Sequence, residues 1–283
     1  MPSRWILLFS VASGARAMTF WPMALTAPNE LDERFALVTS FLRRARSVLF
    51  VTGAGISADS GLPTYRGVGG LYEVADTPEG LPIEEILSGE MVSRNPALTW
   101  HYLHEIESAA HGARFNEAHA FVAEAEKRHE RVWVITQNVD GLHRAAGSSR
   151  VIDIHGDIHD LRCTVCDFTE TVVSFETLAP LPLCPRCNAA LRPDVVLFGE
   201  LLPTAKVWAM EKELAAGFDV VFSVGTTSVF PYIVRPVLEA KRRGAPTVEI
   251  NPGETVVSDL VDVKLPLGAA DAFQSIRKKL YAP

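Results

Sequence analysis

The sequence is poor in cysteine, in long apolar runs and in excess basic charge. Its 283 residues include four cysteines, and all four fall in two Cys-x-x-Cys pairs. No apolar stretch reaches the length of a membrane span, which argues against a helical membrane protein. The formal net charge of −7 argues against a nucleic-acid-binding protein held by phosphate contacts.

Hydrophobic residues make up 48% of the chain, which suffices for one generous domain or for one domain with a small module. We find no internal repeat and no low-complexity segment. Residues 1–28 are interpreted as an N-terminal extension. Arg4, the apolar run after it and Ala15-Arg16-Ala17 resemble a weak secretory signal. We prefer a start codon placed too far upstream, with Met18 or Met23 as the true start.

The stretch that organises the chain covers residues 48–61. It starts with an apolar run that contains β-branched residues, which predicts a buried strand. The glycine turn Gly53-Ala54-Gly55 follows, and Ser57 can cap a helix that starts there. Glycines allow a phosphate to approach the backbone, and a helix N-terminus favours negative charge. The stretch is therefore a candidate phosphate-binding loop, with an ordinary strand-to-helix turn as the alternative.

Four further apolar runs predict strands, and each run ends in a polar or glycine-rich loop. They cover residues 132–136, 151–154, 219–224 and 247–250. Apolar residues at helical spacing predict helices from Asn29, within 68–131, over 233–243 and over 270–280. This alternation predicts an α/β fold, a Rossmann-like parallel sheet with helices on both faces. Ligands bind such sheets outside the carboxyl ends of the strands, so the polar loops should share one crevice.

The chain divides into three parts by composition. Residues 29–156 and 194–283 are assigned to the Rossmann-like domain, and residues 157–193 to a cysteine-bearing module. A helical insertion over about 68–131 is expected to cover one face of the sheet.

Two cysteine pairs define the small module. Cys163 and Cys166 are separated from Cys184 and Cys187 by seventeen residues, 167–183. Each pair can supply two thiolates from one tight turn, and two pairs close a tetrahedral zinc site. A site with four protein ligands has no open position, so the zinc should be structural. Disulfides and a redox pair are the alternatives, and they explain two matched pairs less well.

Polar residues at the expected strand ends are the candidates for chemistry. His155 follows a strand and titrates near neutrality, which suits a general base, although a histidine satisfied by the core is the alternative. Gln137, Asn138 and Asp140 place amides and a carboxylate in one loop, and turn chemistry is the alternative there. The small-residue loop 225–228 suits contacts to ribose and phosphate.

Several of these motifs together resemble the sirtuin family of NAD-dependent protein deacylases. They are Gly53-Ala54-Gly55-Ile56-Ser57, Tyr65-Arg66, Gln137-Asn138-Val139-Asp140, His155-Gly156 and the two cysteine pairs. The resemblance covers about residues 48–270 and is closest to bacterial members. It implies that NAD is consumed as a co-substrate, that zinc is structural, and that nicotinamide and O-acyl-ADP-ribose are released.

The resemblance also implies roles for individual residues. His155 would deprotonate a ribose hydroxyl of NAD, and Asn138 and Asp140 complete the candidate catalytic set. From Gly225 to Pro231 the loop is one residue shorter than the commonest sirtuin spacing. The candidate cofactor-binding residues are Gly53, Ala54, Gly55, Ser57, Tyr65, Arg66, Gln137, Asn138, Asp140, Gly225, Thr226, Thr227, Ser228, Asn251 and Ala270.

Substrate recognition is expected after the cysteine module. In the family the segment that matches 195–200 pairs with the peptide backbone by strand addition. Family members that prefer acidic acyl groups carry a Tyr-x-x-Arg pair. Here Tyr102 matches the tyrosine, but Glu105 stands where the arginine would be and would repel a succinyl group. The candidate substrate-binding residues are Val196, Leu197, Phe198, Gly199 and Glu200.

The sequence therefore predicts a cytoplasmic NAD-dependent lysine deacetylase that acts on acyl-lysine proteins or peptides, with no membrane or specific nucleic-acid partner. A mono-ADP-ribosyltransferase and a desuccinylase are the alternative enzymes. A non-catalytic module that binds NAD or a partner is the third alternative, and a candidate base at His155 counts against it.

Overall fold

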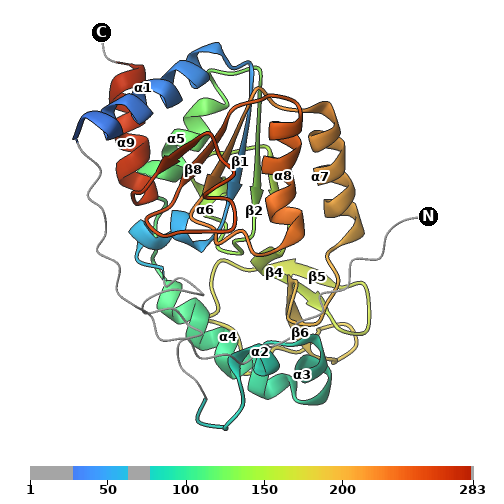
Figure 1. Cartoon of the computed structure of the whole chain (residues 1–283). Coiled ribbons are helices and arrows are strands. Elements are labelled where there is room, and N and C mark those ends of the chain that lie inside the picture. The colour runs from blue at the N-terminus through green and yellow to red at the C-terminus, as the bar shows by residue number, and fades with distance from the viewer. Residues whose placement is uncertain (1–27, 63–76, 282–283) are drawn as a thin grey trace.

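A parallel sheet of six strands forms the centre of the protein (Figure 1). The computed structural model describes residues 28–62 and 77–281. The strand order is β3-β2-β1-β7-β8-β9, and neighbouring strands are parallel. This confirms the expected Rossmann-like α/β fold. The strands are β1 (Ser47–Thr52), β2 (Arg131–Thr136), β3 (Val151–Asp153), β7 (Val220–Val224), β8 (Thr247–Ile250) and β9 (Val263–Leu265).

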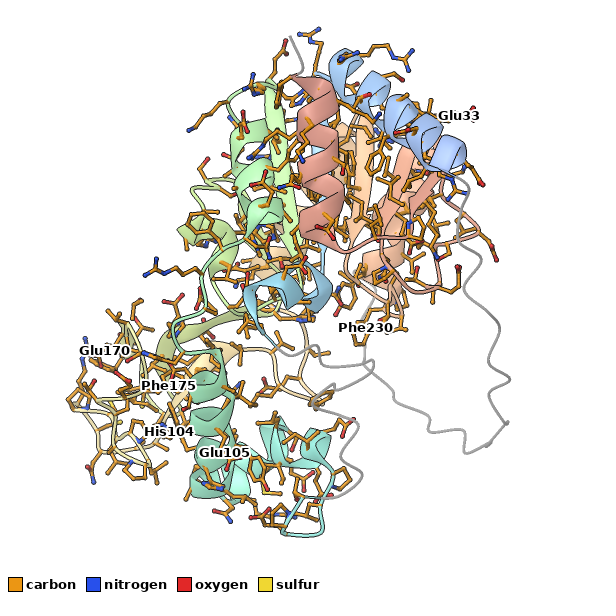
Figure 2. All side chains as sticks on the ribbon, turned by 90° about the vertical axis from the view of Figure 1, so that its left-hand side faces the viewer. Glu33, His104, Glu105, Glu170, Phe175 and Phe230 are labelled. Atoms are coloured by element: carbon orange, nitrogen blue, oxygen red, sulfur yellow. The ribbon has the colours of Figure 1, made fainter. Side chains whose placement is uncertain are left out.

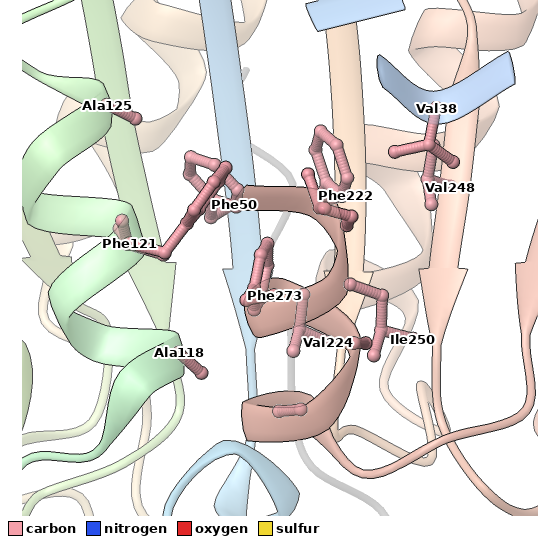
Figure 3. Close-up of a cluster of buried hydrophobic side chains, with 14 of the residues drawn as sticks. Val38, Phe50, Ala118, Phe121, Ala125, Phe222, Val224, Val248, Ile250 and Phe273 are labelled. Atoms are coloured by element: carbon pink, nitrogen blue, oxygen red, sulfur yellow. The ribbon is translucent and has the colours of Figure 1, made fainter. Parts of the chain in front are cut away.

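Helices on both faces bury the central strands. Successive strand residues point to opposite faces, and in β1 both sets are apolar and buried. On one face lie α1 (Pro28–Arg44), α5 (Glu117–Ala125) and α9 (Ala269–Leu280). Figure 3 shows aromatic rings from the sheet and from these helices meeting there, with centroids 5.1 Å apart for Phe50 and Phe222 and 4.7 Å apart for Phe121 and Phe273.

The opposite face of the sheet is covered by α7 (Thr204–Ala216) and α8 (Pro231–Arg242) (Figure 1). Leu49 and Val51 of β1 join the cluster that these helices bury. The helix α8 and the closing helix α9 agree with the expected ranges to within two residues. The sequence analysis predicted neither α7 nor the short edge strand β9.

A second, antiparallel sheet carries the cysteine module. Its order is β5-β4-β6, with β4 (Gly156–Cys163), β5 (Thr169–Thr171) and β6 (Leu191–Val195). The helices α2 (Ile83–Ile86), α3 (Gly89–Arg94) and α4 (Pro96–Ala110) lie beside this sheet (Figure 1). The expectation that the whole insertion covers the large sheet was wrong, because only α5 does so.

The contact between α4 and the cysteine module explains this arrangement. Trp100 is 1% exposed and its indole N–H donates to the carbonyl oxygen of Leu191 at 2.7 Å. The Trp100 ring lies 5.2 Å from the ring of Phe175 in the cysteine module. Figure 2 shows Phe175 beside His104, which also belongs to α4. A buried indole needs both apolar contacts and a hydrogen-bond acceptor, and the module supplies both.

The glycine turn after β1 leads into two short turns of 3-10 helix instead of an α-helix. These are η1 (Ala54–Ile56) and η2 (Ala58–Ser60), and Gly61 ends them with a φ of +83°. The expected helix N-terminus at Ser57 is therefore absent, and with it most of the expected helix dipole. A further short helix, α6 (Leu142–Ala145), follows the loop after β2. None of the described helices is long and apolar enough to cross a membrane.

Gly156 forms the joint between the two sheets and supports a stability prediction. Its φ is +97°, and a Cβ there would collide with the carbonyl oxygen of Asp194 on β6. We expect Gly156→Ala to cost about 3 kcal/mol, because left-handed strain and overpacking add. Gly147 has a φ of +102° but open space around it, so Gly147→Ala should cost only about 1 to 2 kcal/mol. Urea unfolding would measure both, and equal costs would contradict the collision.

Candidate active site and metal centre

The four cysteines converge on one point of the small module. Their Sγ atoms all lie within 4.8 Å of one another. The Cys163–Cys187 distance is 3.4 Å, and the distances from Cys166 to Cys184 and Cys187 are both 3.6 Å. Thiolates at about 2.3 Å around a tetrahedral zinc stand about 3.8 Å apart, so this cluster fits zinc. Four protein ligands leave no open position, which makes the site structural.

The first glycine loop and the loop after β7 meet at the carboxyl ends of their strands. Gly53 N–H donates to Val224 at 3.1 Å, and Gly55 N–H donates to Gly225 at 2.8 Å. A Cβ on Gly55 would lie 2.6 Å from the Cα of Gly225. The strand order reverses between β1 and β7, which is where open α/β sheets bind ligands. Gly55 and Gly225 are therefore needed for the packing of the two loops, independently of any phosphate group that binds there.

Ser57 connects the two candidate polar residues of the loop after β2. Its hydroxyl donates to the Oδ2 of Asp140 at 2.7 Å and accepts from the side-chain amide of Asn138 at 3.1 Å. Asn138 also donates to the carbonyl oxygen of Gly53 at 3.2 Å. The sequence-predicted residues Gly53, Ser57, Asn138 and Asp140 thus form one hydrogen-bonded unit.

Asp140 is buried within this unit, and burial raises its pKa above the ordinary value for an aspartate. Two donors oppose that effect, the backbone N–H of Leu142 at 3.0 Å and the hydroxyl of Ser57. The His119 ring lies behind Ser57, with its Nε2 at 3.4 Å from the Ser57 hydroxyl. The carboxyl group is thus held in one orientation, pointing toward the crevice loops.

A second set of contacts joins Gln137 to the loop after β7. The side-chain amide of Gln137 donates to the hydroxyl of Thr226 at 2.7 Å. Asn251, at the end of β8, donates to the carbonyl oxygen of Thr226 at 3.1 Å. Three strands therefore contribute to one polar cluster, as the strand-end argument predicted.

His155 directly follows β3 and is held at both ring nitrogens. Its Nδ1 lies 3.0 Å from the carbonyl oxygen of Gln137, so Nδ1 carries the proton. Its Nε2 lies 2.7 Å from the hydroxyl of Tyr232. Burial, with a smaller contribution from the nearby Lys206 ammonium, lowers the pKa of His155 to about 4 against the opposing effect of its hydrogen bond to Gln137. The imidazole is therefore a neutral base at physiological pH.

The remaining candidate cofactor residues differ in exposure and in whether their polar groups are already hydrogen-bonded within the chain. Thr227 is exposed, whereas Ser228 is buried with a φ of 54°. The backbone N–H of Ala270 is already bonded to the Oδ2 of Asp59 at 3.0 Å. The candidates Tyr65 and Arg66 lie outside the described residues.

The expected peptide-binding segment after β6 is largely paired within the chain. Val196 N–H donates to the His155 carbonyl at 2.8 Å, and Phe198 N–H donates to Leu87 at 3.0 Å. The carbonyl of Phe198 accepts from Gly89 at 3.1 Å. Gly199 has a φ of +80°, which breaks the extended chain. These contacts leave few backbone groups of the segment open to an added strand.

The Glu200 side chain forms an ion pair and a hydrogen bond within the protein. It binds the buried Arg192 through both carboxylate oxygens, at 2.6 and 2.9 Å, and accepts from the backbone N–H of Leu197 at 2.9 Å. Arg192 lowers the pKa of Glu200 against the opposing effect of burial. This pair fixes the turn after Leu197, so the described contacts give Glu200 a structural task.

A cavity of about 230 Å³ lies between the polar crevice and α4. Ser57, Asn138 and Asp140 line its inner end. Its other described lining residues include Ala54, Leu62, Ile106, Glu107, Ala110, His111, Val139, Ile158 and His159. Neither His155 nor segment 196–200 is among its described lining residues.

The residues expected to set acyl preference are placed differently from the sequence argument. Tyr102 is buried and its hydroxyl donates to the carboxylate of Glu79. Glu105 is exposed and lies 3.4 Å from His101 on the surface of α4 (Figure 2). The carboxylate that reaches the cavity belongs to Glu107, which is 5% exposed. The repulsion expected from Glu105 is therefore not supported by its position.

Sequence reasoning missed three residues around the site. His119 sits on α5 behind Ser57, and no local pattern marks it. His159 lies within β4 and lines the cavity, and the neighbouring Asp157 raises its pKa. Tyr232 is the second residue of α8 and its hydroxyl lies 2.7 Å from Nε2 of His155. Only Tyr232 had a usable signal, because an aromatic pair with proline directly follows the loop after β7.

The cysteine cluster predicts a metal requirement for stability. Cys184→Ser should lose the metal and lower the unfolding temperature, because zinc binding contributes folding free energy. Val165→Ala is a matched control, since Val165 lies between two ligands but is 76% exposed. Metal analysis and thermal unfolding would test both variants. A Cys184→Ser protein that keeps its full zinc content would contradict the site.

Three buried histidines predict a loss of stability in mild acid. Burial lowers the pKa of His119 and His155 to about 4 and of His143 to about 3. Unfolded histidines titrate near 6.5, so below that pH the unfolded chain binds more protons than the folded chain. Stability should therefore fall as pH falls from about 6.5 to 4, by up to about 1.4 kcal/mol per pH unit for each histidine.

Urea unfolding from neutral pH down to about pH 5 measures this slope. His119→Asn removes one of the three histidines that take up a proton on unfolding. The slope of the unfolding free energy against pH should therefore decrease by about a third. A stability that does not change over this range would show that the three rings are not held neutral.

The comparisons with known proteins agree on one family. The model of the Sir2 family matches residues 53–231. NAD-dependent protein deacylase 2 of Pseudomonas aeruginosa is 48% identical over 249 residues, which cover 87% of this chain and 97% of that protein. NAD-dependent protein deacylase 2 of Pseudomonas syringae pv. tomato is 49% identical over 234 residues, covering 82% and 94% respectively.

Solved structures give the same result. A crystal structure of a Sir2 homologue in complex with NAD has a TM-score of 0.76 at 34% identity and covers 87% of this chain and 94% of its own. A Sir2 complex with a p53 peptide and NAD has a TM-score of 0.74 at 28% identity, covering 86% and 97%. The fold is thus shared, and the chain belongs to the Sir2 family.

Proposed function

We propose that this protein is an NAD-dependent protein lysine deacetylase. The observation that carries the proposal is the neutral imidazole of His155, held at the strand ends beside the Gln137–Asp140 loop. The relatives' names state NAD-dependent protein deacylation, and a neighbouring Sir2 structure holds a deacetylated peptide with acetyl-ADP-ribose. NAD is the co-substrate, and acyl-lysine peptides or proteins are the second substrate.

The reaction consumes the whole NAD molecule. The acyl oxygen of the substrate lysine attacks the ribose carbon bonded to nicotinamide, and nicotinamide leaves. A ribose hydroxyl then loses its proton to Nε2 of His155 and attacks the acyl carbon. Lysine then leaves from the former acyl carbon, and addition of one water molecule to the remaining cyclic intermediate gives O-acyl-ADP-ribose as the second product. Nε2 suits this step, because Nδ1 already holds its proton against the Gln137 carbonyl.

The polar unit behind the crevice would position the cofactor. The Asn138 amide and the Asp140 carboxyl, which hydrogen bonds to Ser57 hold in place, would meet the nicotinamide end. The loop after β7 and Asn251 would meet the ribose and adenine end. We propose residues 29–156 and 194–283 as the NAD-binding domain and 157–193 as the zinc module, with residues 68–131 as a helical insertion. The reducing cytoplasm is the compartment we propose, because free thiolates persist there as zinc ligands.

An uncharged acyl group is the form we propose for the substrate. A neighbouring Sir2 structure, which holds a deacetylated peptide with acetyl-ADP-ribose, supports an acetyl group. The position of Glu105 on the surface of α4 gives no support of its own.

Nicotinamide release and O-acyl-ADP-ribose formation from NAD together test the proposal, and we expect both to require an acetyl-lysine peptide. His155 acts after nicotinamide has left, so His155→Ala should lower the rate of O-acyl-ADP-ribose formation by at least about a hundredfold, the range of general-base catalysis. His129→Ala is a matched control, because His129 only contacts the Ala45 carbonyl at 2.9 Å, at the far end of β1. Faster release with succinyl-lysine peptide would overturn the acyl assignment. ADP-ribose attached to protein without an acyl-lysine would favour a mono-ADP-ribosyltransferase.

A further inference from the structure

Three aromatic rings meet where the loop after β7 enters α8. The rings of Phe230 and Tyr232 are nearly parallel, with an interplanar angle of 14° and centroids 5.5 Å apart. The His155 ring stands edge-on to both, at 6.4 Å from Phe230 and 6.1 Å from Tyr232. Figure 2 shows Phe230 at the edge of the large domain that faces the cysteine module. Tyr232 therefore reaches His155 from a different segment than any residue assigned to catalysis.

The direction of the hydrogen bond between Tyr232 and His155 follows from the other side of the imidazole. A carbonyl oxygen only accepts, so Nδ1 donates to Gln137 and Nε2 keeps its lone pair. The phenol must then donate to Nε2, at 2.7 Å. Burial raises the pKa of Tyr232, so its hydroxyl keeps its proton at physiological pH.

This contact occupies the atom that the reaction needs. A general base has to lie about 2.6 to 3.2 Å from the oxygen whose proton it takes. The lone pair of Nε2 points in one direction in the ring plane and accepts one donor well. The Tyr232 hydroxyl and a ribose hydroxyl therefore cannot both be bonded to Nε2 in this geometry.

We propose that the Tyr232 hydroxyl is a placeholder for the substrate hydroxyl: it covers Nε2 of His155 in the free enzyme and is displaced when NAD binds. The inference rests on the proposed role of His155 as the base. Tyr232 is therefore a positioning residue. In the absence of NAD it holds the His155 imidazole in the tautomer and orientation that proton transfer requires.

The local structure suits a displacement by side-chain rotation. Pro231 occupies the first turn of α8 and fixes its backbone, so the movement falls to the Tyr232 ring. Both Tyr232 and Phe230 are only partly buried. The charged groups that face His155 are Lys206, and behind it Asp153, whose Oδ1 holds the Lys206 ammonium at 2.9 Å. Neither offers Nε2 a competing hydrogen bond in the described contacts.

Tyr232→Phe tests the placeholder, because it removes the hydroxyl and keeps the ring. We expect the dissociation constant for NAD to fall by about twofold to tenfold, since one hydrogen bond no longer has to be exchanged. The pKa of His155 in the free enzyme should rise, because a donor to the neutral nitrogen is lost. Calorimetry and an NMR titration of the His155 ring measure these two quantities.

Tyr281→Phe is the matched control, because Tyr281 lies at the end of α9 and stacks on Arg128. It should change neither quantity. Tyr232→Phe with an unchanged His155 pKa, or with weaker NAD binding, would overturn the placeholder. A merely structural tyrosine would shift thermal stability but would not raise that pKa.

The two proposals can fail separately. The NMR titration and NAD binding need no turnover, so both predicted shifts would support the placeholder even if no peptide-dependent nicotinamide release were found. O-acyl-ADP-ribose formation that depends on His155, combined with no change in either quantity in Tyr232→Phe, would support the deacetylase and overturn the placeholder.

Discussion

The site depends on the close approach of two backbone loops at the centre of the large sheet. Gly55 donates to Gly225 at 2.8 Å, and a side chain at either glycine would push the loops apart. This contact fixes the carbonyl of Gly53, which in turn accepts from Asn138. Asn138 and Asp140 are then joined through Ser57. Backbone packing at the switch point of the sheet therefore sets the positions of side chains that lie far apart in sequence.

Much of this arrangement could be predicted from sequence because its signals are local. Apolar runs that end in glycine or polar loops gave the central strands, and paired cysteines gave the metal cluster. The strand-end rule placed Gln137, His155 and Asn251 around one crevice, as the structure has them. The parallel order of strands puts all these ends at the same edge, so no long-range information was needed.

What could not be predicted depends on contacts between distant segments. The sequence of α4 has the pattern of an ordinary amphipathic helix. Its position depends on contacts with distant residues of the cysteine module, namely the hydrogen bond from Trp100 to Leu191 and the ring contact of Trp100 with Phe175. The strand β9 has three residues, too few for a periodic signal. The pairing of Glu200 with Arg192 is likewise a structural contact of an expected substrate residue that no local pattern signals.

The helix α4 contacts both the cysteine module and the cavity beside Asp140. Trp100 anchors one end of this helix to the sheet that holds the cysteines, and Ile106, Glu107 and Ala110 further along form a wall of the cavity. If a ligand in the cavity binds more tightly when α4 is packed on the cysteine module, thermodynamic reciprocity requires that it also strengthens metal binding by that module. Occupancy of the cavity and binding of metal at the cysteines would then share one coupling free energy, carried by the packing of α4.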